Sequence, residues 1–306
     1  MLPTVSPSAQ LFLADVSNVQ SQINTAENQL SSGLKISQPS DSPEQLEALM
    51  RIRADLDRNT QVTNNLSVVQ SETDPAEKAL ETATQLMDRV VTLASQGANT
   101  TQTADSRQAI AQEVTDILQQ MVGLSQTQVQ GRHVFSGDQP SLASYQLDLS
   151  APNGVDRLIM PTATRQIVDA AGVSFTVAKT AQDIFDHRNP DDSLAPDNVF
   201  ASINGLIVAL QNNDQAGVAA SIDSLHTASD YLNSQLSFYG SVQSRIQDAQ
   251  TYSSNYQVQL QTQLSQVQDA DVTQAAIQLS QNTTQLNAAM SAEAQRPRTS
   301  LFDFLA

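Results

Sequence analysis

Cysteine is absent from all 306 residues of the chain, and so is tryptophan. Without cysteine the chain can form no disulfide, no thiolate metal site and no cysteine nucleophile. Aromatic residues make up only 4% of the sequence and charged residues only 15%. Few bulky side chains are therefore available for a large globular core, and we expect helices that bury narrow seams of Leu, Val, Ile and Ala against one another.

Basic residues are also scarce, because 15 Lys and Arg stand against 32 Asp and Glu, for a formal net charge of −17. This charge repels phosphate backbones and anionic lipid headgroups, which disfavours nucleic-acid binding. No run approaches the roughly 18 apolar residues that span a bilayer, so we expect no membrane insertion. The start, "MLPTVSP", lacks the basic and apolar regions of a cleavable secretory signal. The protein therefore either stays in the cytoplasm or leaves the cell by a route without a cleaved signal.

The residues that carry chemistry are few and scattered. The three histidines, His133, His187 and His226, lie in the entry to a predicted insert, a loop and a helix, and could bind a metal only if the fold brought them together with carboxylates. The acidic loop at residues 189–198 lacks the alternating spacing and late Glu of a calcium loop. No Ser, His and Asp grouping follows a strand and turn. We therefore expect no catalytic site, no cofactor and no metal, and interpret the chain as a structural protein rather than an enzyme.

Apolar residues spaced alternately three and four apart predict a first helix from about Ser6 to Ser32. Gly33 can end it as a C-cap, and a joint rich in Ser, Pro and Asp follows. Either Ser40 or Asp41 can serve as the N-cap of the next helix, which starts near Pro43. The joint therefore separates two helical segments.

The second segment predicts a helical hairpin, with a helix on each side of a turn at residues 95–103. Pro75 predicts a kink or a short break in its first helix. From Gly131 to about Asn189 short β-branched stretches separated by Gly, Pro and Asp predict a small β-rich insert. We expect the helical seams to lie outside this insert, so that deleting residues 136–189 leaves the helical layer folded.

Helices resume at Val199–Gln211 and again from about Ala216. With almost no Gly or Pro before Pro297, the last region predicts one long helix whose apolar stripe changes phase past Asp271. The expected fold class is mainly α: a long helical bundle or coiled coil with a small β-rich inserted domain. Three domains are expected: a terminal coiled-coil domain, disordered in the monomer, a helical-bundle core and a β-rich outer insert. Their respective ranges are 1–42 with 268–306, 43–130 with 197–267, and 131–196.

Three stretches carry a resemblance to a known family. "LSSGLKISQPSDSP", Leu30–Pro43, resembles the N-terminal signature of the flagellin-like proteins of the bacterial flagellum. Within that superfamily, the Pro39–Pro43 form is similar to the branch of hook–filament junction proteins known as hook-associated protein 3. "GRHVFSG", Gly131–Gly137, and the ending "TSLFDFLA" resemble stretches of the same branch. The resemblance covers both helical ends and the entry to the insert, which implies a flagellin-like fold.

The resemblance implies a structural adaptor at the hook–filament junction, exported by the flagellar secretion apparatus and located outside the cell. The implied partners are neighbouring copies in a ring, another hook-associated junction protein, flagellin and an export chaperone. The joint would separate an inner layer of paired chain ends from an outer layer of packed helices. A divergent filament-forming flagellin is the alternative, and a cytoplasmic coiled-coil tether unrelated to motility is a third class.

The chain ends are the expected assembly interface, because two thin helices cannot bury their seams without neighbouring subunits. We expect the seam residues to be largely solvated in the isolated chain. The apolar tail would be another contact, since such a surface is unfavourable in water. The expected interface residues are Val16, Val19, Ile23, Leu30, Leu279, Leu286, Met290, Leu301, Phe302 and Phe304.

Overall fold

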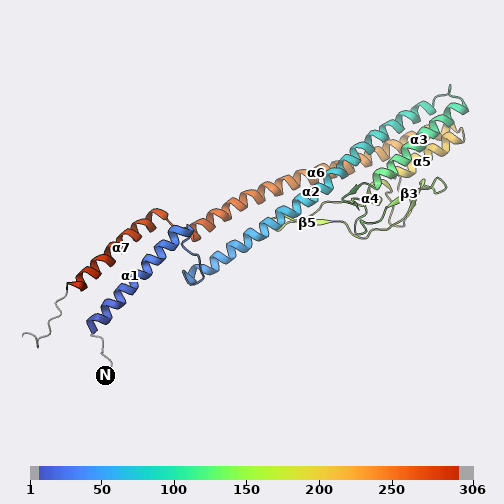
Figure 1. Cartoon of the computed structure of the whole chain (residues 1–306). Coiled ribbons are helices and arrows are strands. Elements are labelled where there is room, and N and C mark those ends of the chain that lie inside the picture. Colours follow the sequence, from blue (N-terminus) through green and yellow to red (C-terminus); the bar gives the residue numbers. More distant parts are fainter. Residues whose placement is uncertain (1–6, 296–306) are drawn as a thin grey trace, which may run out of the picture. The chain divides into compact units, whose positions relative to one another are not determined.

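The computed structural model describes residues 7–295, apart from the side chain of Ser8. Long packed helices and small β-hairpins make up this part of the chain, as the sequence predicts (Figure 1). It divides into two compact units. The terminal unit contains the residues up to Arg58 and from Tyr256 onward, and the central unit contains Asn59–Asn255. The three-domain division remains a prediction, and its insert, residues 131–196, lies inside the central unit.

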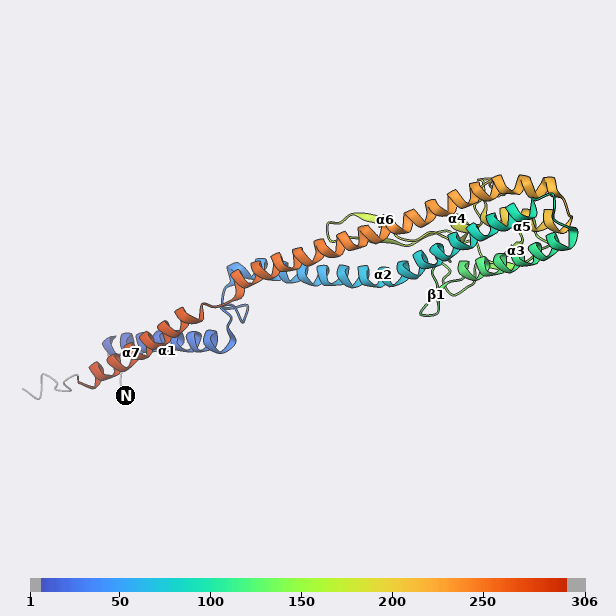
Figure 2. The same cartoon turned by 90° about the horizontal axis from the view of Figure 1, so that it is seen from above.

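Two helices dominate the terminal unit: α1 (Pro7–Ser32) and α7 (Val272–Ala294). They lie side by side in both views and run in opposite directions, since α1 ends where α7 begins (Figures 1 and 2). The first part of α2 (Pro43–Gly97) and the last part of α6 (Gln215–Gln268) complete this unit. The burial pattern of α1 agrees with the predicted seam, because each turn of the helix carries a partly or fully buried apolar residue.

The expectation of one long C-terminal helix is wrong, because the chain breaks between Gln268 and Val272. Asp271 caps α7 at this break: its Oδ1 accepts the N–H of Gln274 at 3.0 Å. A side-chain cap satisfies an amide that a new helix would otherwise leave unpaired, so the break is stabilised locally. The phase change of the stripe therefore marks a real interruption.

The N-terminal joint also differs from its prediction in one detail. Gly33 ends α1 as expected, with φ at +72° and its N–H donating to the Gln29 carbonyl at 2.9 Å. Asp41, however, does not cap α2. Its Oδ2 accepts the N–H groups of Gln38 at 2.7 Å and Ser37 at 2.9 Å, which lowers the pKa of the Asp41 carboxyl below its ordinary value. Asp41 therefore folds the joint itself, and α2 begins at Pro43.

Pro75 does not break α2, which continues through it to Gly97. A proline removes one backbone hydrogen bond, but helices tolerate it where packing on both sides holds the chain. Leu66 and Val69 are buried before Pro75, and Ala76 and Leu80 are buried after it. This packing against the central unit keeps the helix continuous.

The central unit is built around α2 and α6, which pack with α3 (Ala104–Ser125) and α5 (Val199–Gln211). Thr103 caps α3 and Asn198 caps α5, each accepting an N–H of the first turn. Most of the apolar seam residues of the hairpin helices and of α6 are buried. They include Leu80, Met87, Val90, Val114, Ile117 and Met121 from α2 and α3, and Leu225, Leu232 and Tyr239 from α6.

The β-rich insert consists of three separate two-stranded antiparallel hairpins and a short helix, α4 (Ala181–Phe185). Gln130 and Gly131 form the tight turn of the first hairpin with φ at +52° and +77°, a conformation that favours glycine. The hairpins pair β1 (Gln128–Val129) with β2 (Arg132–His133), β3 (Tyr145–Leu147) with β4 (Val155–Arg157), and β5 (Gln166–Val168) with β6 (Ser174–Thr176).

The insert is not separate from the helical core, contrary to the expectation from sequence. Phe135, Tyr145 and Phe185 are fully buried and belong to the same apolar cluster as the seams of α2, α3, α5 and α6. A second cluster joins Ile167 and Phe175 of the third hairpin to α2 and α6. The apolar seams of α2, α3, α5 and α6 do not cover one another completely, and the apolar side chains of the insert cover the face that remains. The insert therefore completes the core of the central unit.

Candidate assembly interface

The seam of α1 faces α7, and its burial is greatest near the joint. Ala26 and Ile23 are buried, with 1% and 6% of their surfaces exposed. Val16, Val19 and Leu30 are only partly covered. The four predicted residues of α1 therefore share one face, and that face retains exposed apolar surface.

The α7 residues divide into two groups. Leu279 and Leu286 lie on the same face as the buried Ala275, and they are partly covered. Met290 follows Leu286 at helical spacing but is 55% exposed. The sequence predicts a largely solvated stripe, but the two leucines are more covered than that, because α7 pairs with α1. The exposed surface of Met290 can still contact another molecule.

The remaining predicted residues, Leu301, Phe302 and Phe304, lie outside the residues that the structure describes. The sequences of α1 and α7 are also poor in charge: Asp15, Glu27 and Glu293 are their only charged residues, and none is basic. Gln, Asn, Ser and Thr occupy most other exposed positions. Because like charges repel most at short distance, a nearly uncharged helix pair is the part of this acidic chain best suited to side-by-side packing.

The two interruptions bind each other, although they are distant in the sequence. We name this contact, between residues 33–36 and 268–270, the clasp. The Ala270 N–H donates to the Gly33 carbonyl at 2.9 Å, and the Lys35 N–H donates to the Gln268 carbonyl at 2.7 Å. Leu34 and Asp269 are paired as in an antiparallel sheet. A hint was present in the sequence, because Gly33 and Asp271 are both helix-capping residues near the ends of adjacent seams.

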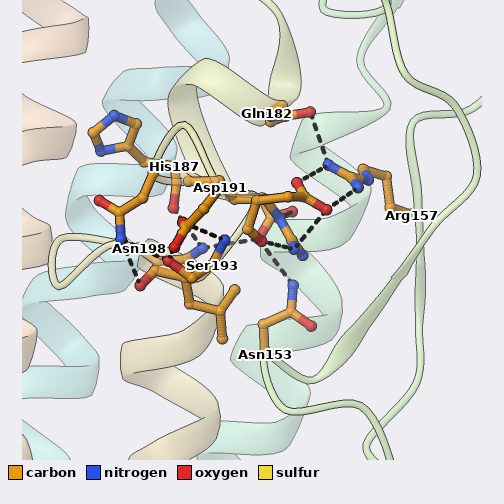
Figure 3. Close-up of polar contacts among 12 residues, drawn as sticks. Asn153, Arg157, Gln182, His187, Asp191, Ser193 and Asn198 are labelled. Carbon is orange, nitrogen blue, oxygen red and sulfur yellow. Dashed lines mark hydrogen bonds and ion pairs between the residues drawn. The ribbon is translucent and has the colours of Figure 1, made fainter.

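A buried polar network in the central unit is the main cluster of charged groups beyond the terminal helices (Figure 3). Asp186 at its centre is fully buried. Its Oδ1 accepts the side-chain amides of Asn153 at 2.9 Å and Asn198 at 2.8 Å. Its Oδ2 accepts the Tyr145 hydroxyl at 3.1 Å and forms an ion pair with Arg188 Nε at 2.8 Å. Burial, and then the nearby Asp186 charge, raise the pKa of the Tyr145 hydroxyl.

The network fastens the insert to the helices rather than forming a reactive site. Arg157 on β4 binds both carboxylate oxygens of Asp192, at 2.8 and 3.0 Å, and so ties a hairpin to the loop before α5 (Figure 3). Among the described side chains, every buried nitrogen and oxygen has a partner. Residues 7–295 contain no group of His, Asp and Glu arranged to hold a metal ion. A fully paired network of this kind stabilises one arrangement of the chain.

Replacing Asp186 with Ala should therefore lower the free energy of unfolding by about 3–5 kcal/mol, because it removes the acceptor of the buried Tyr145 hydroxyl and Asn153 amide and one of the carboxylate partners of Arg188. The matched control is Asp191→Ala in the same loop, whose carboxylate is exposed and binds only Ser193. That change should cost less than about 1 kcal/mol. Urea unfolding followed by circular dichroism measures both. A destabilisation below about 1 kcal/mol for Asp186→Ala would mean that the network is not formed in solution.

Comparison with known families matches residues 7–139 to the bacterial flagellin N-terminal helical region and residues 221–305 to the bacterial flagellin C-terminal helical region. The two matches lie on either side of residues 140–220, which hold most of the insert, and together account for most of the chain. The chain belongs to the bacterial flagellin family. The family resemblance in the sequence is thereby confirmed, and this flagellin-family chain is a structural protein of the flagellum, not an enzyme.

Solved structures similar to this flagellin-family protein share its fold at low sequence identity. A protein described as a flagellar hook-associated protein from Vibrio parahaemolyticus is 18% identical with a TM-score of 0.63, over 75% of this chain and 100% of that one. FlgL from Xanthomonas campestris is 19% identical with a TM-score of 0.57, and the match covers 71% of this chain and 99% of that one. Flagellar hook-associated protein-3 from Legionella pneumophila is 13% identical with a TM-score of 0.61, and the match covers 71% of this chain and 98% of that one.

A search of curated protein sequences finds no match to this flagellin-family protein. None of its helices, within the part of the chain that the structure describes, is long and apolar enough to cross a membrane. The family places the protein in the extracellular flagellum.

Proposed function

We propose that this flagellin-family protein is the adaptor subunit of the hook–filament junction, assembled as a ring that links the hook side to the flagellin filament. The partly exposed seam of α1 and α7 is the observation that carries the proposal. Its residues Val16, Val19, Leu279 and Leu286 remain incompletely covered after the two helices have paired. In a ring, neighbouring copies would cover this surface.

Two further features support a junction subunit over a filament-forming flagellin. The Pro39–Pro43 joint is similar to that of junction proteins, and the "GRHVFSG" stretch leads from a tight hairpin turn into the core at Phe135. The similar solved structures named above, two of which carry hook-associated names, are covered over 98–100% of their own lengths. No large extra domain of those structures is therefore missing from this chain.

The proposed partners follow from this position. They are copies of the same chain in the ring, a second hook-associated junction protein on the hook side, and flagellin on the filament side. An export chaperone would bind the chain before assembly, and export through the flagellar secretion apparatus would leave no cleaved signal. Copies of the chain are expected to meet through the nearly uncharged faces of α1 and α7.

Deletion of the gene tests the proposal against the alternative. We expect cells that keep an intact hook, lose the filament and release flagellin into the medium, because flagellin would be exported with nothing to attach to. Cells that lose the filament without releasing flagellin would indicate a filament-forming flagellin instead. The purified protein should also stop at limited rings, whereas polymerisation without limit would contradict the junction role. Re-expression of the intact chain is the control.

A further inference from the structure

The clasp joins two helix interruptions that are distant in the sequence, and we propose that it sets the register of α1 against α7 and is the point from which the pair becomes ordered. Three backbone hydrogen bonds form it: Ala270 to Gly33 at 2.9 Å, and Lys35 and Ile36 to Gln268 at 2.7 and 3.3 Å. Ile36 is 2% exposed and Gln268 is 8% exposed, so the clasp is buried on the side of these two residues, whereas Lys35 and Asp269 are exposed. Buried backbone bonds of this kind are shielded from competing water.

The side chains of the seam cannot define the register by themselves. Seam positions on α1 recur every seven residues, as in Val16, Ile23 and Leu30, and those on α7 recur in the same way, as in Leu279 and Leu286. Sliding one helix by seven residues, about 10 Å, would again place seam against seam. Only a contact outside the repeat can favour one alignment strongly, and the clasp is such a contact.

The most buried seam residues of the pair lie near the clasp, although Leu30 and Leu279, which are also close to it, are only partly covered. Ala26 and Ala275, the seam residues with least exposure at 1% each, lie within about two turns of it. Val16 and Leu286, farther out, are only partly covered. Because starting a helix is the unfavourable step and extending it is easier, a fixed point at one end allows both helices to grow outward from it. Order in the terminal unit should therefore decrease from the clasp toward the chain ends.

This inference concerns a single chain, so it stands independently of the proposed junction role. Its tests use the purified full-length protein and hydrogen exchange, and the junction proposal is tested in cells. A failure of one can therefore be told apart from a failure of the other.

The first test replaces Ala270 with Pro, which removes the N–H that donates to the Gly33 carbonyl. The control is Val272→Pro two residues later, at the first position of α7, where proline is well tolerated. We expect amides of α1 and α7 to exchange at least about tenfold faster in the first variant and to change little in the control. The central unit should exchange as in the wild type. Wild-type exchange of protected α1 and α7 amides in the Ala270→Pro variant would overturn the proposal.

The second test closes the clasp covalently and also works if the wild-type pair exchanges quickly. Leu34 and Asp269 form a non-hydrogen-bonded antiparallel pair, for which Cα atoms lie about 4.5 Å apart, within the range of about 4.4–6.8 Å for disulfides. The chain has no other cysteine, so Leu34→Cys with Asp269→Cys can form only one intramolecular bond. The reduced variant is the matched control.

We expect the disulfide to form under mild oxidation and to slow exchange in both helices by at least about tenfold. The protection should be strongest at residues 23–32 and 272–279, which lie nearest the clasp. Thiols that stay unpaired would show that the clasp is open in solution. An oxidised protein that exchanges like the reduced one would show that the clasp does not order the pair. Either result would overturn the proposal.

Discussion

Cells that carry Leu279→Asp with Leu286→Asp should export the protein but lose their filaments. Both leucines lie on the face of α7 that packs against α1, and both keep exposed apolar surface that neighbouring copies would cover. A buried leucine contributes roughly 2 kcal/mol, so losing two from each contact weakens assembly by roughly a thousandfold, before the added desolvation of two carboxylates. We therefore expect non-motile cells with intact hooks and flagellin in the medium.

The matched control is Gln278→Asp with Gln285→Asp. These residues precede the two leucines, are exposed, and receive the same added charge. Motility should remain close to that of the wild type if the apolar face, and not the charge of α7, determines assembly. Met290→Asp tests contact with a neighbouring copy separately from the pairing of α7 with α1, because Met290 is 55% exposed in the single chain. A loss of motility in that variant would place Met290 against a neighbouring copy.

The stability of the central unit should be unaffected by the double change. No residue of α1 or α7 belongs to either apolar cluster of the central unit. Its unfolding free energy should therefore change by less than about 0.5 kcal/mol, as for an exposed site, when measured by denaturant unfolding. A double variant that swims normally would contradict the assembly interface. One that unfolds the central unit would show that the α7 face belongs to the main core.

Deletion of residues 136–189, closed by a short Gly-Ser linker, should unfold the central unit. The deleted segment removes Tyr145 and Phe185 from the main cluster, together with Ile167 and Phe175 from the second. Removing one buried phenylalanine side chain alone costs about 3–5 kcal/mol. We therefore expect the cooperative thermal transition to disappear or to fall by at least about 15 °C, measured by circular dichroism. A helical signal that melts as in the wild type would restore the view of the insert as a separate domain.

A single substitution tests the same point without a new linker. Phe185 is fully buried, stacks on Phe200 with ring centres 5.7 Å apart, and meets the edge of Phe135 at 6.0 Å. Phe185→Ala should cost about 3–5 kcal/mol. The control is Val168→Ala in the same insert, since Val168 is 52% exposed and its loss should cost less than about 0.5 kcal/mol. Equal stabilities of the two variants would contradict a shared core.

The position and type of nearly every long helix could be predicted from sequence, because an apolar residue every three or four positions is a local property of the chain. Gly33 as the end of α1 was equally predictable, since its left-handed φ of +72° is a conformation that glycine adopts without strain. The family followed from three short stretches in order, and the seam residues Val16, Ile23 and Leu279 followed from spacing alone.

Only the tertiary structure decided how these parts meet. The pairing of Leu34 with Asp269 and the collection of Tyr145, Asn153 and Asn198 around Asp186 join residues that are distant in sequence, and no local pattern encodes such partners. The insert looked separate because its β-type spacing differs from that of the helices. Burial depends on which surface lies opposite, however, and Phe135 and Phe185 cover a face that the helices leave open. The sequence by itself determined the helices, the joint at Gly33 and the family, and long-range packing decided which distant residues meet and what completes the core.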